Sequence, residues 1–82
     1  MNAGNAVIIK PDVQTTLTAL WVIDLMVQAG VPESVVRVVP GDGPVVGPMV
    51  IERVDYVMFT GSTRVGREVA ARCGQRLIGC SL

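Results

Sequence analysis

The chain has 82 residues and a formal net charge of +0; 50% of its residues are hydrophobic and only 17% are charged. A chain this short forms one small domain at most, and so apolar a composition indicates that most of it is buried within a larger body. No apolar run approaches the roughly 20 residues that span a membrane, and the N-terminus lacks the basic start and apolar core of a signal peptide. We therefore expect a cytoplasmic protein without a membrane partner.

The first predicted strand is the apolar run over residues 5–9, which ends before Pro11 because proline has no N–H for a strand ladder. Thr15 or Thr16 is expected to cap the helix that follows, and Gly30 to end it. Two apolar rows run along this helix, one formed by Leu20, Ile23 and Val27 and a second beside it formed by Leu17, Trp21 and Leu25.

A second strand is predicted over residues 35–39, where β-branched side chains predominate. Residues 40–44 must form a turn, because two glycines and two prolines in five residues do not continue a strand. Pro44 suits the first turn of a short helix that reaches about Arg53. A third strand is predicted over residues 56–60.

Gly61 turns the chain, and Ser62 with Thr63 is expected to cap a helix that Gly74 ends. A fourth strand begins with residues 77–80. The core positions of the last helix follow a four-residue spacing: Val65, Val69 and Cys73. The order β-α-β-α-β-α-β, with strands of about five residues, predicts an α/β fold with a parallel sheet, a segment of a Rossmann-like nucleotide-binding domain.

Histidine is absent from the chain, and the spacing of Cys73 and Cys80 matches no zinc or thioredoxin motif, so we expect no metal site and interpret both cysteines as ordinary buried residues. The C-terminal part carries five arginines: 53, 64, 67, 72 and 76. No aromatic residues are interleaved with them, so we interpret them as a solvated helix face and expect no nucleic-acid partner.

Three loops leave the carboxyl ends of predicted strands, where open parallel sheets bind their ligands: residues 10–14, 40–47 and 60–66. In the last loop, Gly61 allows close backbone approach and Ser62 opens a helix, which together favour phosphate binding. A well-capped helix after a tight turn is the alternative. Lys10, the only lysine, follows a strand and is either a ligand for phosphate or ribose or an ordinary exposed lysine. Neither common nucleotide-binding glycine motif is present.

Four segments together resemble the aldehyde dehydrogenase superfamily in order and spacing, over essentially the whole chain. They are GNAVIIKPDVQTTLTAL (residues 4–20), AGVPESVV (29–36), GDGPVVG (41–47) and FTGSTRVG (59–66). The resemblance is nearest to the succinate-semialdehyde dehydrogenase branch. One departure is Thr16, which stands where the family usually has proline. The resemblance implies that the chain contributes cofactor binding to an enzyme that oxidises an aldehyde to the carboxylic acid with NAD(P).

The resemblance also implies a role for particular residues. Lys10 would contact the adenosine ribose, and Val13 stands where NAD-preferring members often have a glutamate that would repel a 2′-phosphate, so NADP is slightly favoured over NAD. The remaining implied cofactor-binding residues are Gly43, Pro44 and Gly47 at the adenine, Gly61 and Ser62 at the pyrophosphate, Val65 packed on the cofactor, and Phe59 and Thr60 in the same loop.

No catalytic residue is expected within residues 1–82, which we interpret as part of an NAD(P)-binding domain without catalytic and oligomerisation domains. The resemblance implies that the nucleophilic cysteine and catalytic glutamate follow Leu82, so this chain alone is expected to be inactive. Its expected partners are the remainder of a homo-oligomeric parent enzyme and, through that enzyme, a small aldehyde. Two alternatives are a stand-alone phosphate- or nucleotide-binding regulatory module and a truncation product that does not fold alone.

Overall fold

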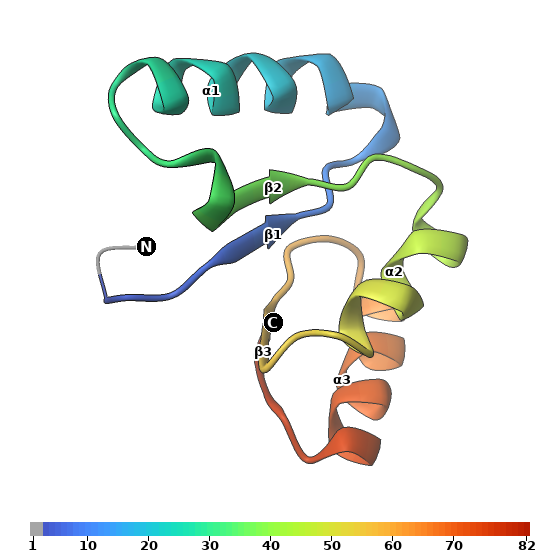
Figure 1. The fold of residues 1–82 in the computed structure, drawn as a ribbon. Helices are drawn as coiled ribbons and strands as arrows, with labels where there is room; N and C mark the ends of the chain where they lie inside the picture. Colours follow the sequence, from blue (N-terminus) through green and yellow to red (C-terminus); the bar gives the residue numbers. More distant parts are fainter. Residues whose placement is uncertain (1–2) are drawn as a thin grey trace. The chain divides into compact units, whose positions relative to one another are not determined.

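The computed structural model describes residues 3–82 and contains the predicted order of elements, with parallel strand pairing. The chain divides into two compact units, Met1–Val46 and Gly47–Leu82. The strands form two ladders of two parallel strands each, β1 with β2 (Figure 1) and β3 with β4. The α/β prediction is therefore confirmed. No helix in residues 3–82 combines the length and apolar character needed to cross a membrane.

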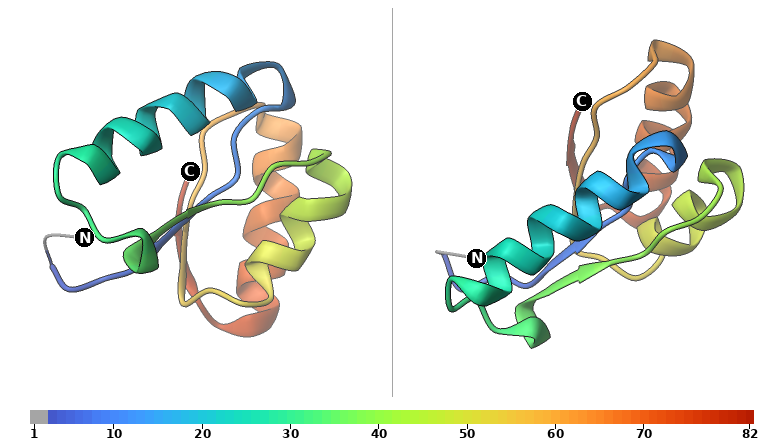
Figure 2. Two further views of the ribbon diagram at one scale, coloured as in Figure 1. Left: turned by 45° about the horizontal axis from the view of Figure 1, so that its top comes forward. Right: turned by 90° about the horizontal axis from the view of Figure 1, so that it is seen from above.

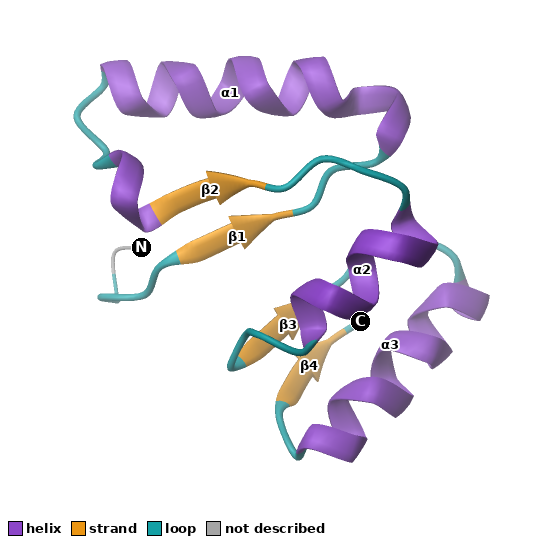
Figure 3. Cartoon of the chain, turned by 45° about the vertical axis from the view of Figure 1, so that its right-hand side comes forward, coloured by secondary structure: helices purple, strands orange, loops and turns teal. Residues whose placement is uncertain are grey.

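In the first unit, β1 (Val7–Ile9) pairs with β2 (Val36–Val38) in the register Val7↔Val36 and Ile9↔Val38. Parallel neighbours need a long crossover connection, and α1 (Thr16–Gln28) provides it. Figure 3 shows α1 alongside the two strands, whose arrows point the same way. The strands have three residues instead of the predicted five: a 3-10 turn (Glu33–Val35) precedes β2, whereas β1 begins at Val7 and ends at Ile9, before Pro11, as predicted.

The two apolar rows of α1 have different surroundings. The row with Ile23 and Val27 is half-buried and, with Leu20, faces β2. In the second row, Leu17 is 83% exposed and Trp21 is 63% exposed. The left view of Figure 2 shows this helix running beside the first two strands. An apolar surface of this kind on a single helix is typical of a face that another segment covers.

In the second unit, β3 (Tyr56–Met58) pairs with β4 (Gly79–Ser81), and α3 (Thr63–Arg76) is the crossover. The core contains Val69 and Cys73 of α3, as their four-residue spacing predicted, together with Ile51 from the end of α2 (Gly43–Ile51). Five half-buried side chains pack against this cluster: Val57, Phe59, Val65, Ile78 and Cys80. A core this small agrees with the expectation that the chain needs further contacts.

Helix ends account for most of the differences from the sequence predictions. Thr15 is at the N-cap position of α1 but makes no side-chain cap hydrogen bond. Asp12 instead caps the preceding 3-10 turn (Val13–Thr15), since its carboxylate accepts the Gln14 N–H at 2.8 Å. At the other end of the chain, α3 continues past Gly74 to Arg76 and ends at Leu77, which has a left-handed φ of 59°.

The Arg76 side chain, although exposed, makes two hydrogen bonds within the second unit, which the interpretation of the five arginines as a solvated face did not include. Its Nη1 donates to the carbonyl oxygens of Ile51 and Val54, each at 2.6 Å. These carbonyls lie at and just beyond the C-terminus of α2, where a cation is electrostatically favoured. Arg64, Arg67 and Arg72 are exposed as predicted, and Arg64 pairs with Glu68 at 3.6 Å.

We expect Arg76→Ala to destabilise the protein by about 2 kcal/mol, because the carbonyl oxygens of Ile51 and Val54 lose a charged donor. Urea unfolding followed by circular dichroism measures the loss. Arg72→Ala is the matched control: it removes an exposed arginine from the same helix and is expected to change stability by no more than about 0.5 kcal/mol. Equal effects of the two substitutions would show that the Arg76 contacts contribute nothing specific.

Candidate functional site

In the first unit, two of the predicted cofactor-binding residues lie together. Lys10 follows β1, and Gly43 lies beyond β2 at the start of α2. A Cβ placed on Gly43 would be 3.8 Å from the Lys10 Nζ, so the ammonium lies close to the glycine backbone. The Lys10 Nζ donates one hydrogen bond, to the Pro11 carbonyl oxygen at 2.8 Å. This bond orients the half-buried side chain and leaves ammonium hydrogens for a ligand.

Val13 follows Lys10 by three residues, Pro44 follows Gly43 directly, and both are exposed. Val13 opens the 3-10 turn after Lys10, with 57% of its surface exposed. The carboxylate beside it, that of Asp12, accepts the Gln14 N–H and so is held by the turn. At the position of Val13 itself the chain presents a neutral, accessible side chain.

In the second unit, the N-terminus of α3 has the geometry of an anion-binding helix end. Ser62 is the N-cap residue, and its Oγ accepts the Val65 N–H at 3.2 Å, as the sequence predicted. The Ser62 hydroxyl hydrogen is left free to donate. Thr60 and Gly61 precede it and are exposed. The first N–H groups of a helix have no partner within it and carry a partial positive charge, so this end suits a phosphate.

Phe59, Val65 and Gly47 complete the set of predicted site residues. Phe59 and Val65 are half-buried, and both pack against the core of the second unit. Gly47 is half-buried in α2, with open space where a Cβ would stand. The structure therefore brings Phe59, Gly61, Ser62 and Val65 together around one helix end, in the same unit as Gly47.

Neither cysteine has the surroundings of a nucleophile. Cys73 is 1% exposed, and burial raises the pKa of its thiol above the ordinary 9.0; the adjacent Cys80 raises it further, and Arg76 lowers it. A raised pKa disfavours the reactive thiolate. Cys80 is half-buried rather than buried, so the prediction of two buried cysteines is wrong for that residue, and both thiols are free. Within residues 3–82 no cluster of three potential metal ligands occurs.

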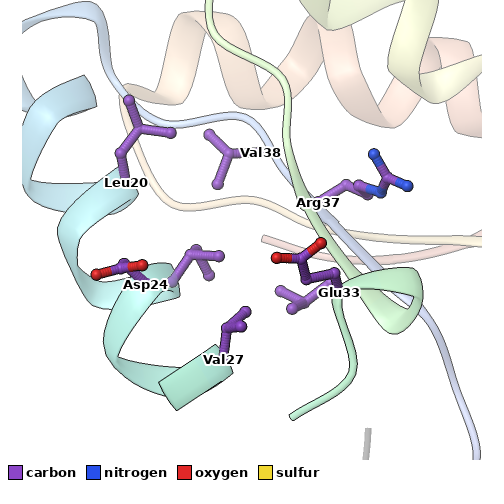
Figure 4. Close-up of a pocket in the computed structure, with 8 residues that line it drawn as sticks. Leu20, Asp24, Val27, Glu33, Arg37 and Val38 are labelled. Atoms are coloured by element: carbon purple, nitrogen blue, oxygen red, sulfur yellow. The ribbon is translucent and has the colours of Figure 1, made fainter.

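An open cavity of about 280 Å³ lies between α1 and β2 (Figure 4), apart from the predicted site residues. Its apolar lining comes from the packing row of α1 and from β2, and Asp24, Glu33 and Arg37 are its charged members. The Asp24 carboxylate is already bonded to the Gln28 side-chain amide at 2.8 Å. The cavity lies along the contact between the helix and the strand, and its lining residues include no group of hydrogen-bond donors that point to one place. It is therefore not a candidate site.

Comparison with known proteins gives one consistent result. The sequence profile described as "Aldehyde dehydrogenase family" matches residues 1–82. A protein of Mycolicibacterium smegmatis named "Putative succinate-semialdehyde dehydrogenase", with NADP(+) in its name, is 53% identical over 79 residues, which cover 96% of this chain. Aldehyde dehydrogenase 1A1 of Mesocricetus auratus is 44% identical over 77 residues and 92% of this chain.

The fold comparison agrees. The "Crystal Structure of a Putative Aldehyde Dehydrogenase from Burkholderia cenocepacia" matches with a TM-score of 0.87 and 38% identity, over 95% of this chain and 16% of that chain. The chain spans about 15% of the length of the curated relatives it matches.

Proposed function

The chain belongs to the aldehyde dehydrogenase family, and from this premise we propose that it forms part of the NAD(P)-binding domain of an enzyme that oxidises an aldehyde to the carboxylic acid. The observation that carries the proposal is the placement of the Lys10 ammonium beside Gly43, beyond the carboxyl ends of two paired parallel strands. Ligands of open parallel sheets bind in this position.

The residues of each unit have the chemistry to bind one part of a dinucleotide. Lys10 supplies a cation whose free hydrogens would donate to the adenosine ribose or its phosphate, while Gly43, Pro44 and Gly47 would lie against the adenine. Gly61 and Ser62, with the first N–H groups of α3, would bind the pyrophosphate, and Thr60 and Val65 would border it. The cofactor, when bound, accepts a hydride from the substrate; this chain binds and orients it.

We propose that the preferred cofactor is NADP. Val13 is exposed and uncharged, so the side chain at this position does not repel a 2′-phosphate. Lys10 would attract that phosphate. The name of the Mycolicibacterium smegmatis relative, which includes NADP(+), supports the same choice.

We further propose that the substrate is succinate semialdehyde and that the partners are the remainder of the parent enzyme and further copies of it. The names of several relatives support the substrate. Exposed apolar side chains support the partners, since Leu17 is 83% and Leu77 92% exposed. The free thiols are typical of a reducing compartment, which supports the cytoplasm.

The test is a calorimetric titration of the intact protein with NADP and NAD, followed by assays of NADP reduction with succinate semialdehyde. Lys10→Ala and Ser62→Ala are each expected to weaken NADP binding about 10-fold or more, the effect of losing a hydrogen bond to a charged group. Arg72→Ala, on the exposed face of α3, should leave the affinity unchanged.

Each part of the proposal has its own contradictory result. Unchanged affinity in both variants would place the cofactor elsewhere. Equal turnover of succinate semialdehyde and an uncharged aldehyde of the same length would contradict the substrate. The alternative of a stand-alone regulatory module is not supported, because the family match extends over residues 1–82 and the relatives are far longer.

A further inference from the structure

The aromatic ring of Phe59 lies directly against Gly61. A Cβ added to Gly61 would be 2.7 Å from the ring Cζ and 3.3 Å from both Cε1 and Cε2. Carbon atoms do not approach so closely without strain, so only glycine fits while the ring keeps its place. At Gly66 a Cβ would be 3.6 Å from Cε1, an ordinary van der Waals contact. The ring therefore excludes a side chain at Gly61 and permits one at Gly66.

Backbone conformation does not account for the glycine at position 61. In the described part of the chain the glycines with positive φ are Gly4, Gly30 and Gly41, so Gly61 has a φ that other residues also adopt. The steric requirement at Gly61 thus comes from a side chain of the same protein, and the missing Cβ points toward the ring.

The core of the second unit holds the Phe59 ring in place. It packs against the cluster of Ile51, Val69 and Cys73. The Phe59 backbone is fixed as well, since its N–H donates to the Ser81 carbonyl oxygen at 2.8 Å and so continues the β3–β4 ladder. To make room for a Cβ at Gly61, either the ring must leave its contact with the core or the loop must be displaced.

We propose that Phe59 is a positioning residue: its ring supports the Gly61 backbone and thereby sets the position of Ser62 and the first N–H groups of α3. Phe59 acts through the loop and makes no contact with the cofactor, in contrast to the role that the family resemblance implied for it. This inference rests on the proposed function, because the position of these groups matters for a bound pyrophosphate.

A double-mutant cycle tests the proposal in the intact protein, with Gly61→Ala, Phe59→Leu and the two combined. Leucine lacks the Cζ, Cε1 and Cε2 atoms that a Cβ at Gly61 would meet. Gly61→Ala alone is expected to weaken NADP binding about 10- to 100-fold, as an ångström-scale displacement of binding groups does. In the Phe59→Leu protein the same substitution should have little further effect. Gly74→Ala, on α3 with open space around it, is the control.

Urea unfolding of the same four proteins gives a readout independent of the cofactor. Gly61→Ala should lower the midpoint in the unchanged protein and not in the Phe59→Leu protein. If Gly61→Ala weakens binding equally in both proteins, the added methyl group meets the cofactor and the proposal is overturned. Equal midpoint losses in both overturn it as well. If the unchanged protein binds neither NADP nor NAD, the proposed function fails, and the positioning role fails with it.

Discussion

Val13→Glu is expected to reverse the proposed cofactor preference, from NADP to NAD. The introduced carboxylate would lie three residues after Lys10. There it would repel a 2′-phosphate and could accept hydrogen bonds from ribose hydroxyls. Like charges in a binding site cost on the order of 1–3 kcal/mol, which corresponds to a loss of about 5- to 150-fold in NADP affinity. Calorimetric titration of the intact protein with both cofactors measures the change.

Val13→Gln is the matched control, because the amide has nearly the shape of the carboxylate and none of its charge. It should leave NADP affinity within about 3-fold of the unchanged protein, a difference below 1 kcal/mol. Val13 is 57% exposed, so neither substitution should disturb the fold. If Val13→Gln weakens NADP binding as much as Val13→Glu does, charge repulsion is not the cause and the explanation of cofactor preference fails.

Gly41→Ala is expected to destabilise the protein by about 2–4 kcal/mol through two separate costs. Gly41 has a φ of 141°, which is strained for any residue with a Cβ, and such strain costs about 1–3 kcal/mol. The new Cβ would also be 2.5 Å from the Val46 Cγ2, an overlap that a β-branched side chain in a helix relieves poorly. The midpoint of urea unfolding reports the sum.

Two other Gly→Ala substitutions separate these costs. Gly30 has a φ of 108° and open space around it, so Gly30→Ala carries the backbone cost alone. Gly74 is helical and also has open space, so Gly74→Ala should stabilise the protein by up to about 1 kcal/mol. The same chemical change is thus expected to lower stability most at Gly41, less at Gly30, and to raise it at Gly74. A loss at Gly41 no larger than that at Gly30 would show that the Val46 overlap is relieved at no cost.

Local patterns in the sequence determined the order of the elements and much of the second unit. The spacing of Val65, Val69 and Cys73 predicted the buried side of α3, and Ser62 before a helix predicted its cap. These predictions succeeded because a helix repeat and a capping hydrogen bond involve residues three or four positions apart. The alternation of short apolar runs with helices likewise predicted parallel pairing.

Tertiary contacts alone decided the features that local patterns missed. The Arg76 side chain binds carbonyls 25 and 22 residues away, and no local pattern distinguishes it from the other arginines of the same helix. A glycine at position 61 is expected in any tight loop. Its steric requirement here, however, comes from the Phe59 ring, which packs against the core. Such contacts depend on the packing of several elements at once, so the sequence predicted which residues form the proposed site, whereas the tertiary structure decided what holds them in place.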